Sequence, residues 1–205
     1  MILFNEWLSV TTIAGLAIMS PGPGFAVVVK NSLTYGREAG IATALGNALG
    51  DMTHVVLNLL GIGLLITNSP RAFGVIQLTG AIYLFWLGIR GILSKPKVEN
   101  DFEFVYKKTN RLRAFYDGFL ATLSNPKAFI FVFALFSVVV SVETPLYHKL
   151  VYGGWIGILS LCWFTIVAIF FTDNRFVSKF QDYRHWLERG TGLILIAFSI
   201  SLFLS

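Results

Sequence analysis

Long apolar runs separated by short polar segments dominate this chain. Six of the runs are long enough to cross a bilayer as helices, and they cover roughly residues 7–30, 39–66, 70–94, 114–140, 147–171 and 186–204. The longest polar segment, 94–113, is too short for a large water-soluble domain. We therefore predict an all-α integral membrane protein in which residues 1–205 form a single multi-pass domain with six transmembrane helices.

The polar loop over 94–113 divides the six runs into two halves of three. An odd number of crossings in each half gives the halves opposite orientations, which is typical of inverted repeats. Residues 20–25 of the first run (Ser-Pro-Gly-Pro-Gly-Phe) resemble residues 124–129 of the fourth (Ser-Asn-Pro-Lys-Ala-Phe). This pattern predicts two inverted three-helix repeats, about 1–94 and about 114–205, joined by a basic loop, with helices 1 and 4 broken.

Composition and charge placement support a membrane location and predict an orientation. The chain is 55% hydrophobic and 13% charged, with a mean hydropathy of +0.70. Of its 16 basic residues, all but Arg71, Lys149 and Lys127 lie in loops after odd-numbered runs. By the positive-inside rule, the 94–113 loop is cytoplasmic and both termini face away from the cytoplasm. The net charge of +5 thus reflects orientation, and no nucleic-acid partner is expected.

The helix breaks follow from prolines inside the apolar runs. Pro21 and Pro23 interrupt the first run, and Pro126 interrupts the fourth. Each proline leaves the carbonyl four residues back without its helical donor, as at Thr122 for Pro126, and such a carbonyl must face protein or a water-filled cavity. Freed carbonyls suit an ammonium group, and the N–H groups just after a break suit a carboxylate. The alternative interpretation is a pair of proline kinks that serve packing alone.

Lys127 directly follows the second break, far from both ends of its run. About 13 residues, or ~20 Å of helical rise, separate it from either end, more than half of a ~30 Å hydrocarbon core. The ammonium group therefore needs a partner, a hydrated cavity or a function.

Four polar residues form a stripe on the second run: Asn47, Asp51, His54 and Asn58 follow i, i+4, i+7, i+11 spacing. An ionised aspartate at that depth must be neutral, paired or hydrated, and a pair with Lys127 would lower the cost of both charges. The stripe is interpreted either as part of a binding site, with His54 in a proton relay, or as hydrogen-bonded packing. Small residues at positions 42, 46 and 50 of the same run predict close contact with a neighbouring helix.

Motifs typical of enzymes are missing from the sequence. It has no paired-histidine zinc motif, no serine elbow, no phosphate-binding glycine loop and no Cys-x-x-Cys, and Cys162 is its single cysteine. No catalytic residue, metal site or cofactor is therefore expected.

Several strings taken together resemble the LysE/RhtB family of amino-acid exporters, in order and spacing over nearly the whole chain. They are Ser-Pro-Gly-Pro at 20–23, Gly-x-x-x-Gly-Asp at 46–51, Gly-Ala-Ile-Tyr-Leu at 80–84 followed by Gly88, and Asn-Pro-Lys-Ala at 125–128. The resemblance implies secondary efflux of amino acids or close derivatives, of the homoserine, threonine, lysine or leucine type, across a bacterial inner membrane, driven by the proton motive force.

The resemblance and the polar stripe together predict a substrate-binding and coupling site. Its expected residues are Pro21, Gly22, Pro23, Gly24, Asn47, Asp51, His54, Asn125, Pro126 and Lys127. Gly24 departs from the family, whose members commonly have Asn or Asp there. In this hypothesis Lys127 and the N–H groups after the breaks hold the carboxylate of a zwitterion, and Asp51 and the freed carbonyls hold its ammonium group.

Two other functions stay open from the sequence: a channel or pore for small solutes or ions, and a nontransporting membrane scaffold. The expected partners are an amino-acid-like small molecule, protons and the lipid bilayer, and the sequence leaves a homo-oligomer open.

Overall fold

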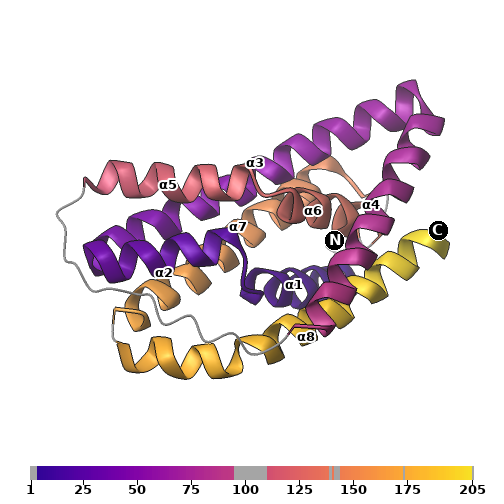
Figure 1. The fold of residues 1–205 in the computed structure, drawn as a ribbon. Helices are drawn as coiled ribbons and strands as arrows, with labels where there is room; N and C mark the ends of the chain where they lie inside the picture. Colours follow the sequence, from indigo (N-terminus) through magenta and orange to yellow (C-terminus); the bar gives the residue numbers. More distant parts are fainter. Residues whose placement is uncertain (1–3, 95–109, 139, 141–143, 173, 205) are drawn as a thin grey trace.

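The computed structural model describes residues 4–94, 110–138, 140, 144–172 and 174–204. These residues form eight helices and no strand: α1 (Phe4–Met19), α2 (Pro23–Tyr35), α3 (Arg37–Asn68), α4 (Pro70–Ile92), α5 (Arg111–Leu123), α6 (Pro126–Val138), α7 (Leu146–Phe170) and α8 (Asn174–Leu204) (Figure 1). The all-α prediction is confirmed. Most of the predicted 94–113 loop, residues 95–109, lies outside the described residues.

Both predicted helix breaks are present. The chain bends by 55° between α1 and α2 and by 59° between α5 and α6. Pro23 is the first residue of α2 and Pro126 the first of α6. A proline fits this position because the N–H it lacks has no intrahelical acceptor there. Each proline therefore starts a new helix in a new direction instead of kinking a continuous one.

Among the described helices, α7 alone is long and apolar enough by itself to cross a membrane. Counting each bent pair, α1–α2 and α5–α6, as one span raises the number to three. The other predicted spans correspond to α3, α4 and α8, so the six crossings and the inverted repeat stay predictions.

Close backbone contacts hold the helices together in pairs. The long helix α3 lies against α5 and α7, and α4 lies against α8 (Figure 1). A methyl group added to Gly46 of α3 would fall 2.0 Å from the carbonyl oxygen of Phe115 in α5. One added to Gly88 of α4 would fall 2.7 Å from the carbonyl oxygen of Gly192 in α8. At both crossings only glycine permits this approach, and for α3 the small residues of the second run predicted it.

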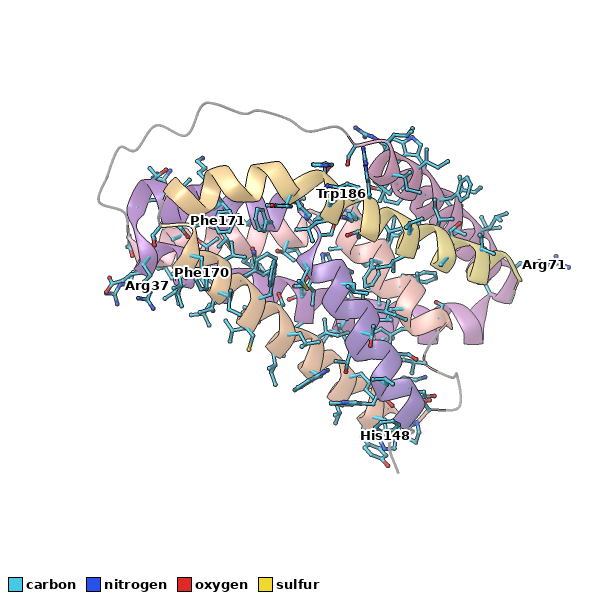
Figure 2. All side chains as sticks on the ribbon, turned by 90° about the horizontal axis from the view of Figure 1, so that it is seen from below. Arg37, Arg71, His148, Phe170, Phe171 and Trp186 are labelled. Carbon is cyan, nitrogen blue, oxygen red and sulfur yellow. The ribbon has the colours of Figure 1, made fainter. Side chains whose placement is uncertain are left out.

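The outer surface and the two ends fit a protein that crosses a membrane. Large apolar side chains such as Leu60, Val75 and Leu193 are more than 60% exposed on the outward faces of their helices. Arg37 and Arg71, which the charge pattern places on opposite sides of the membrane, lie at opposite ends of the molecule (Figure 2).

Candidate functional site

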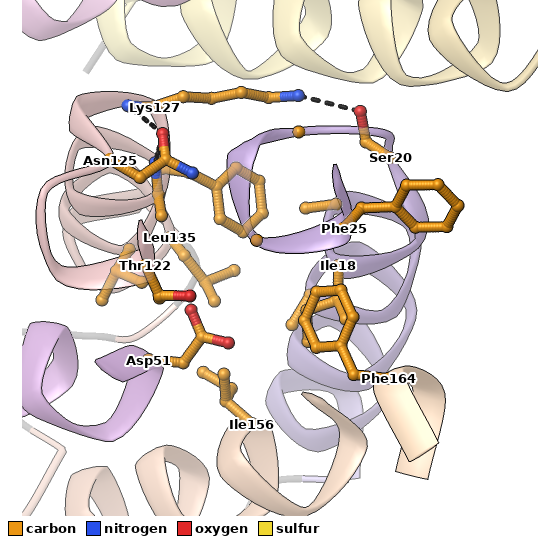
Figure 3. Close-up of a pocket in the computed structure, with 17 residues that line it drawn as sticks. Ile18, Ser20, Phe25, Asp51, Thr122, Asn125, Lys127, Leu135, Ile156 and Phe164 are labelled. Carbon is orange, nitrogen blue, oxygen red and sulfur yellow. Dashed lines mark hydrogen bonds between the residues drawn. The ribbon is translucent and has the colours of Figure 1, made fainter. Parts of the chain in front are cut away.

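A cavity of about 70 Å³ lies where the two helix breaks meet α3 and α7. We call it the central cavity, and its polar lining residues are Ser20, Asp51, Thr122, Asn125 and Lys127. Apolar side chains, among them Ile18, Leu135 and Phe164, make up most of the remaining wall. Figure 3 shows Lys127 and Ser20 at one end of the cavity and Asp51 at the other. A cation and a carboxylate thus face one small space from opposite ends.

Lys127 connects the two breaks. Because α6 begins at Pro126, Lys127 lies in the first turn of this helix, and its side chain extends across the end of the cavity (Figure 3). The Nζ donates a hydrogen bond of 2.8 Å to the Oγ of Ser20, the buried residue just before Pro21. The hydroxyl supplies one acceptor for an ammonium group that has three N–H bonds to donate.

A serine of α7 forms a hydrogen bond with Asp51. The Oδ2 of Asp51 accepts a hydrogen bond of 2.5 Å from the Oγ of Ser160, which is fully buried. Asp51 and Lys127, both in the described part of the chain, form no ion pair with each other. The expected pairing of the two charges is therefore wrong for this structure, since each charge has its own serine.

The two breaks differ in how their N-terminal turns are capped. The Oδ1 of Asn125 accepts from the backbone N–H of Lys127 at 3.1 Å and of Ala128 at 3.4 Å, as an N-cap residue does. Gly22, the cap residue of α2, makes no side-chain bond of this kind. The first turn of α6 therefore has its N–H groups satisfied from within, whereas that of α2 begins at the cavity wall without a side-chain cap.

Asn47 ties three helices together beside the cavity. Its Nδ2 donates to the carbonyl oxygen of Gly24 in α2 at 3.1 Å, and its Oδ1 accepts from the Oγ1 of Thr122 in α5, also at 3.1 Å. A Cβ atom on residue 24 would lie only 3.0 Å from the Nδ2 of Asn47. Gly24 therefore permits the approach of an amide that fills the space beside it.

His54 forms a hydrogen bond with the carbonyl of Thr122, which lacks its i+4 helical donor because residue 126 is a proline. The Nε2 of His54 lies 2.8 Å from the carbonyl oxygen of Thr122. A carbonyl only accepts, so Nε2 carries the proton in this contact. One turn further along, the Nδ2 of Asn58 donates to the carbonyl oxygens of His54 at 2.8 Å and Phe129 at 3.4 Å. These contacts fix the second break against α3.

A second cavity, of about 390 Å³, adjoins the first at the breaks. We call it the α4–α8 cavity, because residues of α4 and α8 complete its wall: Tyr83, Leu87, Arg90, Gly91, Glu188, Thr191, Gly192 and Leu195. Ser20, Gly22, Asn125 and Lys127 line both cavities.

The predicted site residues divide among these surroundings. Gly22, Gly24, Asp51, Asn125 and Lys127 line the central cavity, and Pro21, Pro23 and Pro126 line the α4–α8 cavity. Asn47 and His54 lie behind the wall and hold the backbone of the breaks.

Sequence reasoning missed the two serines that bond the charges. Ser20 belonged to the repeated string, which was a usable signal. Ser160 stands alone between leucines in α7 and had none.

Comparison with known proteins gives consistent matches over most of the chain. The family model of the LysE type translocator matches residues 16–205. The threonine efflux protein of Escherichia coli strain K12 is 30% identical over 202 residues, which cover 97% of this chain and 98% of that protein. The homoserine/homoserine lactone efflux protein of Salmonella typhimurium is 30% identical over 142 residues, 69% of this chain and 68% of that protein. An uncharacterized membrane protein of Bacillus subtilis, YrhP, is 26% identical over 209 residues, 98% of this chain and 100% of that protein. No solved structure matches significantly.

Proposed function

The chain belongs to the LysE type translocator family, and on that premise we propose that it exports a small amino acid of the threonine or homoserine class across a bacterial inner membrane. Two of its matched relatives carry names that state efflux of these compounds. A translocator moves its substrate without transforming it, so the prediction that the chain is not an enzyme is confirmed. The proposed orientation places both termini away from the cytoplasm.

The observation that carries the proposal is the pair of opposite charges at the two ends of the central cavity. An amino acid is a zwitterion, so its site needs a cation for the carboxylate and an anion for the ammonium group. In this proposal the carboxylate replaces Ser20 on the ammonium group of Lys127 and also faces the start of α2, which has no side-chain cap. The substrate ammonium group binds Asp51 in place of the hydroxyl of Ser160. The apolar wall and the volume of about 70 Å³ favour a small side chain.

Asp51 is also our proposed site of proton coupling. A proton bound to the carboxylate removes the charge that holds the substrate ammonium group, so protonation and substrate binding exclude each other there. His54 does not line the cavity, and its Nε2 is bonded to the carbonyl oxygen of Thr122. The contacts of His54 therefore favour a structural role over a relay.

The test is transport of labelled threonine and homoserine into energised inside-out vesicles, where uptake corresponds to export. Asp51→Asn and Lys127→Met should abolish uptake while membrane insertion and thermal unfolding stay close to wild type. The matched controls Asp117→Asn and Lys30→Met change the same residue types outside the central cavity and should retain uptake. Undiminished uptake in both site variants would refute the charge-pair proposal.

The two alternatives give different results in the same vesicles. A channel would show uptake that persists after a protonophore collapses the proton gradient, whereas the proposed exporter should lose accumulation. A nontransporting scaffold would give no uptake even in the wild type.

A further inference from the structure

The α4–α8 cavity has its own set of charged groups. Arg90 lies in the last turn of α4, and Glu188 belongs to α8, which packs against α4. Both residues line a cavity of about 390 Å³, together with Lys127. The guanidinium group of Arg90 lies 4.9 Å from the centre of the Trp86 ring, a cation–π contact that restricts its position. This cavity, like the central one, therefore presents both signs of charge.

The two cavities share part of their walls, including the extended side chain of Lys127. Lys127 and Ser20 line both of them, and the hydrogen bond between Nζ and Oγ joins the two breaks at the boundary. In Figure 3 the Lys127 side chain runs between the central cavity and the ribbon of α8. This bond lies at the shared wall of the two cavities, and a carboxylate can open it by replacing the serine hydroxyl as partner of the ammonium group.

We propose that the α4–α8 cavity is a loading site that binds the zwitterionic substrate before Lys127 passes it to the central cavity, and this inference rests on the proposed export function. Arg90 binds the carboxylate, because its planar guanidinium group can donate two parallel N–H bonds. Glu188 accepts from the ammonium group. Arg90 precedes the loop that the charge pattern places in the cytoplasm, so the loading site opens toward the side from which an exporter takes its substrate.

The proposal explains why the solute moves on instead of staying bound. The carboxylate exchanges one cation for another, from Arg90 to Lys127, and the ammonium group exchanges one carboxylate for another, from Glu188 to Asp51. Each charged group of the substrate thus moves from one oppositely charged side chain to another. Neither group lies unpaired in the low-dielectric interior.

The test measures the concentration dependence of threonine uptake into inside-out vesicles for Arg90→Gln and Glu188→Gln. Loss of one charge-assisted hydrogen-bonding partner should raise KM about ten-fold in each variant, with Vmax close to wild type. The controls are Arg71→Gln, at the exposed start of the same helix α4, and Glu38→Gln, on an exposed turn of α3, and both should keep the wild-type KM. Arg90→Lys keeps the positive charge but cannot donate two parallel N–H bonds. Its KM should therefore lie between those of the wild type and Arg90→Gln.

Two substrate analogues assign the individual contacts. A hydroxy acid that lacks the amine should lose its competitive inhibition in Arg90→Gln and keep it in Glu188→Gln. An amino alcohol that lacks the carboxylate should show the reverse. Wild-type KM values in both variants, with uptake intact, would overturn the loading site and leave the proposed function standing. Wild-type vesicles that take up no amino acid would overturn the proposed function, and the loading site with it.

Discussion

Replacing Gly24 by alanine places a methyl group against the side chain of Asn47. The new Cβ would lie 3.0 Å from the Nδ2 of Asn47 and 3.2 Å from the Oγ1 of Thr122. Asn47 cannot withdraw freely, because it donates to the Gly24 carbonyl and accepts from Thr122. Keeping Asn47 in place overpacks the site at a cost of ~1–3 kcal/mol. Moving it breaks two hydrogen bonds worth about 1 kcal/mol each. By either route the added methyl group costs about 2 kcal/mol of folding free energy.

Helix propensity acts in the opposite direction. Residue 24 lies in the first turn of α2, where alanine is favoured over glycine by up to ~1 kcal/mol. Gly24→Ala should therefore destabilise the protein by a net value of about 1 kcal/mol. In an Asn47→Ala background the amide is gone, and the Thr122 hydroxyl, which no longer has Asn47 as its acceptor, can turn away from the methyl group. There the same substitution should stabilise the protein, so the sign of its effect reverses.

The assay is a double-mutant cycle on the wild type, both single variants and the double variant, each purified in detergent and unfolded under identical conditions. The expected coupling energy between positions 24 and 47 is about 2 kcal/mol, within the usual range for residues in contact. Additive effects, with Gly24→Ala destabilising to the same extent in both backgrounds, would refute the reasoning. Threonine uptake by the four proteins then shows whether this contact also affects transport.

Two further substitutions test the packing and the capping. Gly46→Leu should prevent α3 and α5 from closing, because its Cβ would lie 2.0 Å from the backbone oxygen of Phe115, which cannot move aside; size-exclusion chromatography should show little folded protein. In Gly61→Leu on the same helix, the new Cβ would meet no atom of another helix within 4 Å, so this variant should elute normally. Asn125→Ala removes the cap of α6 and should lower the free energy of unfolding by about 1 kcal/mol, whereas Asn125→Asp should retain most of it, and equal losses in the two variants would contradict the capping role.

The breaks were predictable from the sequence because a proline acts on its own helix. Pro126 lacks an N–H whatever surrounds it, so the loss of the i+4 helical donor to the carbonyl of Thr122 follows from the chain alone. Within the break, the backbone N–H of Asn125 donates to this carbonyl at 3.0 Å. The second donor, His54, was not predictable, because it reaches the carbonyl only where α3 packs along α5 and brings residues 68 positions apart within hydrogen-bonding distance.

Ser160, which donates a hydrogen bond to Asp51, shows why part of the candidate site could not be predicted from the sequence. Ser160 is one polar residue in an apolar helix, without a periodic partner or a neighbouring break. Its hydroxyl bonds Asp51 because α7 lies against α3, and its significance appears only with that packing. Arg90 and Glu188 are a similar case, since they share a cavity through the contact of α4 with α8.

The two breaks contribute different parts to the proposed carboxylate site although their sequences are similar. The α6 end supplies the cation, Lys127, and its N–H groups are bonded to Asn125. The α2 end supplies no cation, and its cap residue Gly22 makes no side-chain bond. The hydroxyl of Ser20 now lies where the two ends meet. In our proposal a carboxylate that displaces this hydroxyl binds Lys127 of α6 and lies at the start of α2, so the proposed site needs residues from both breaks.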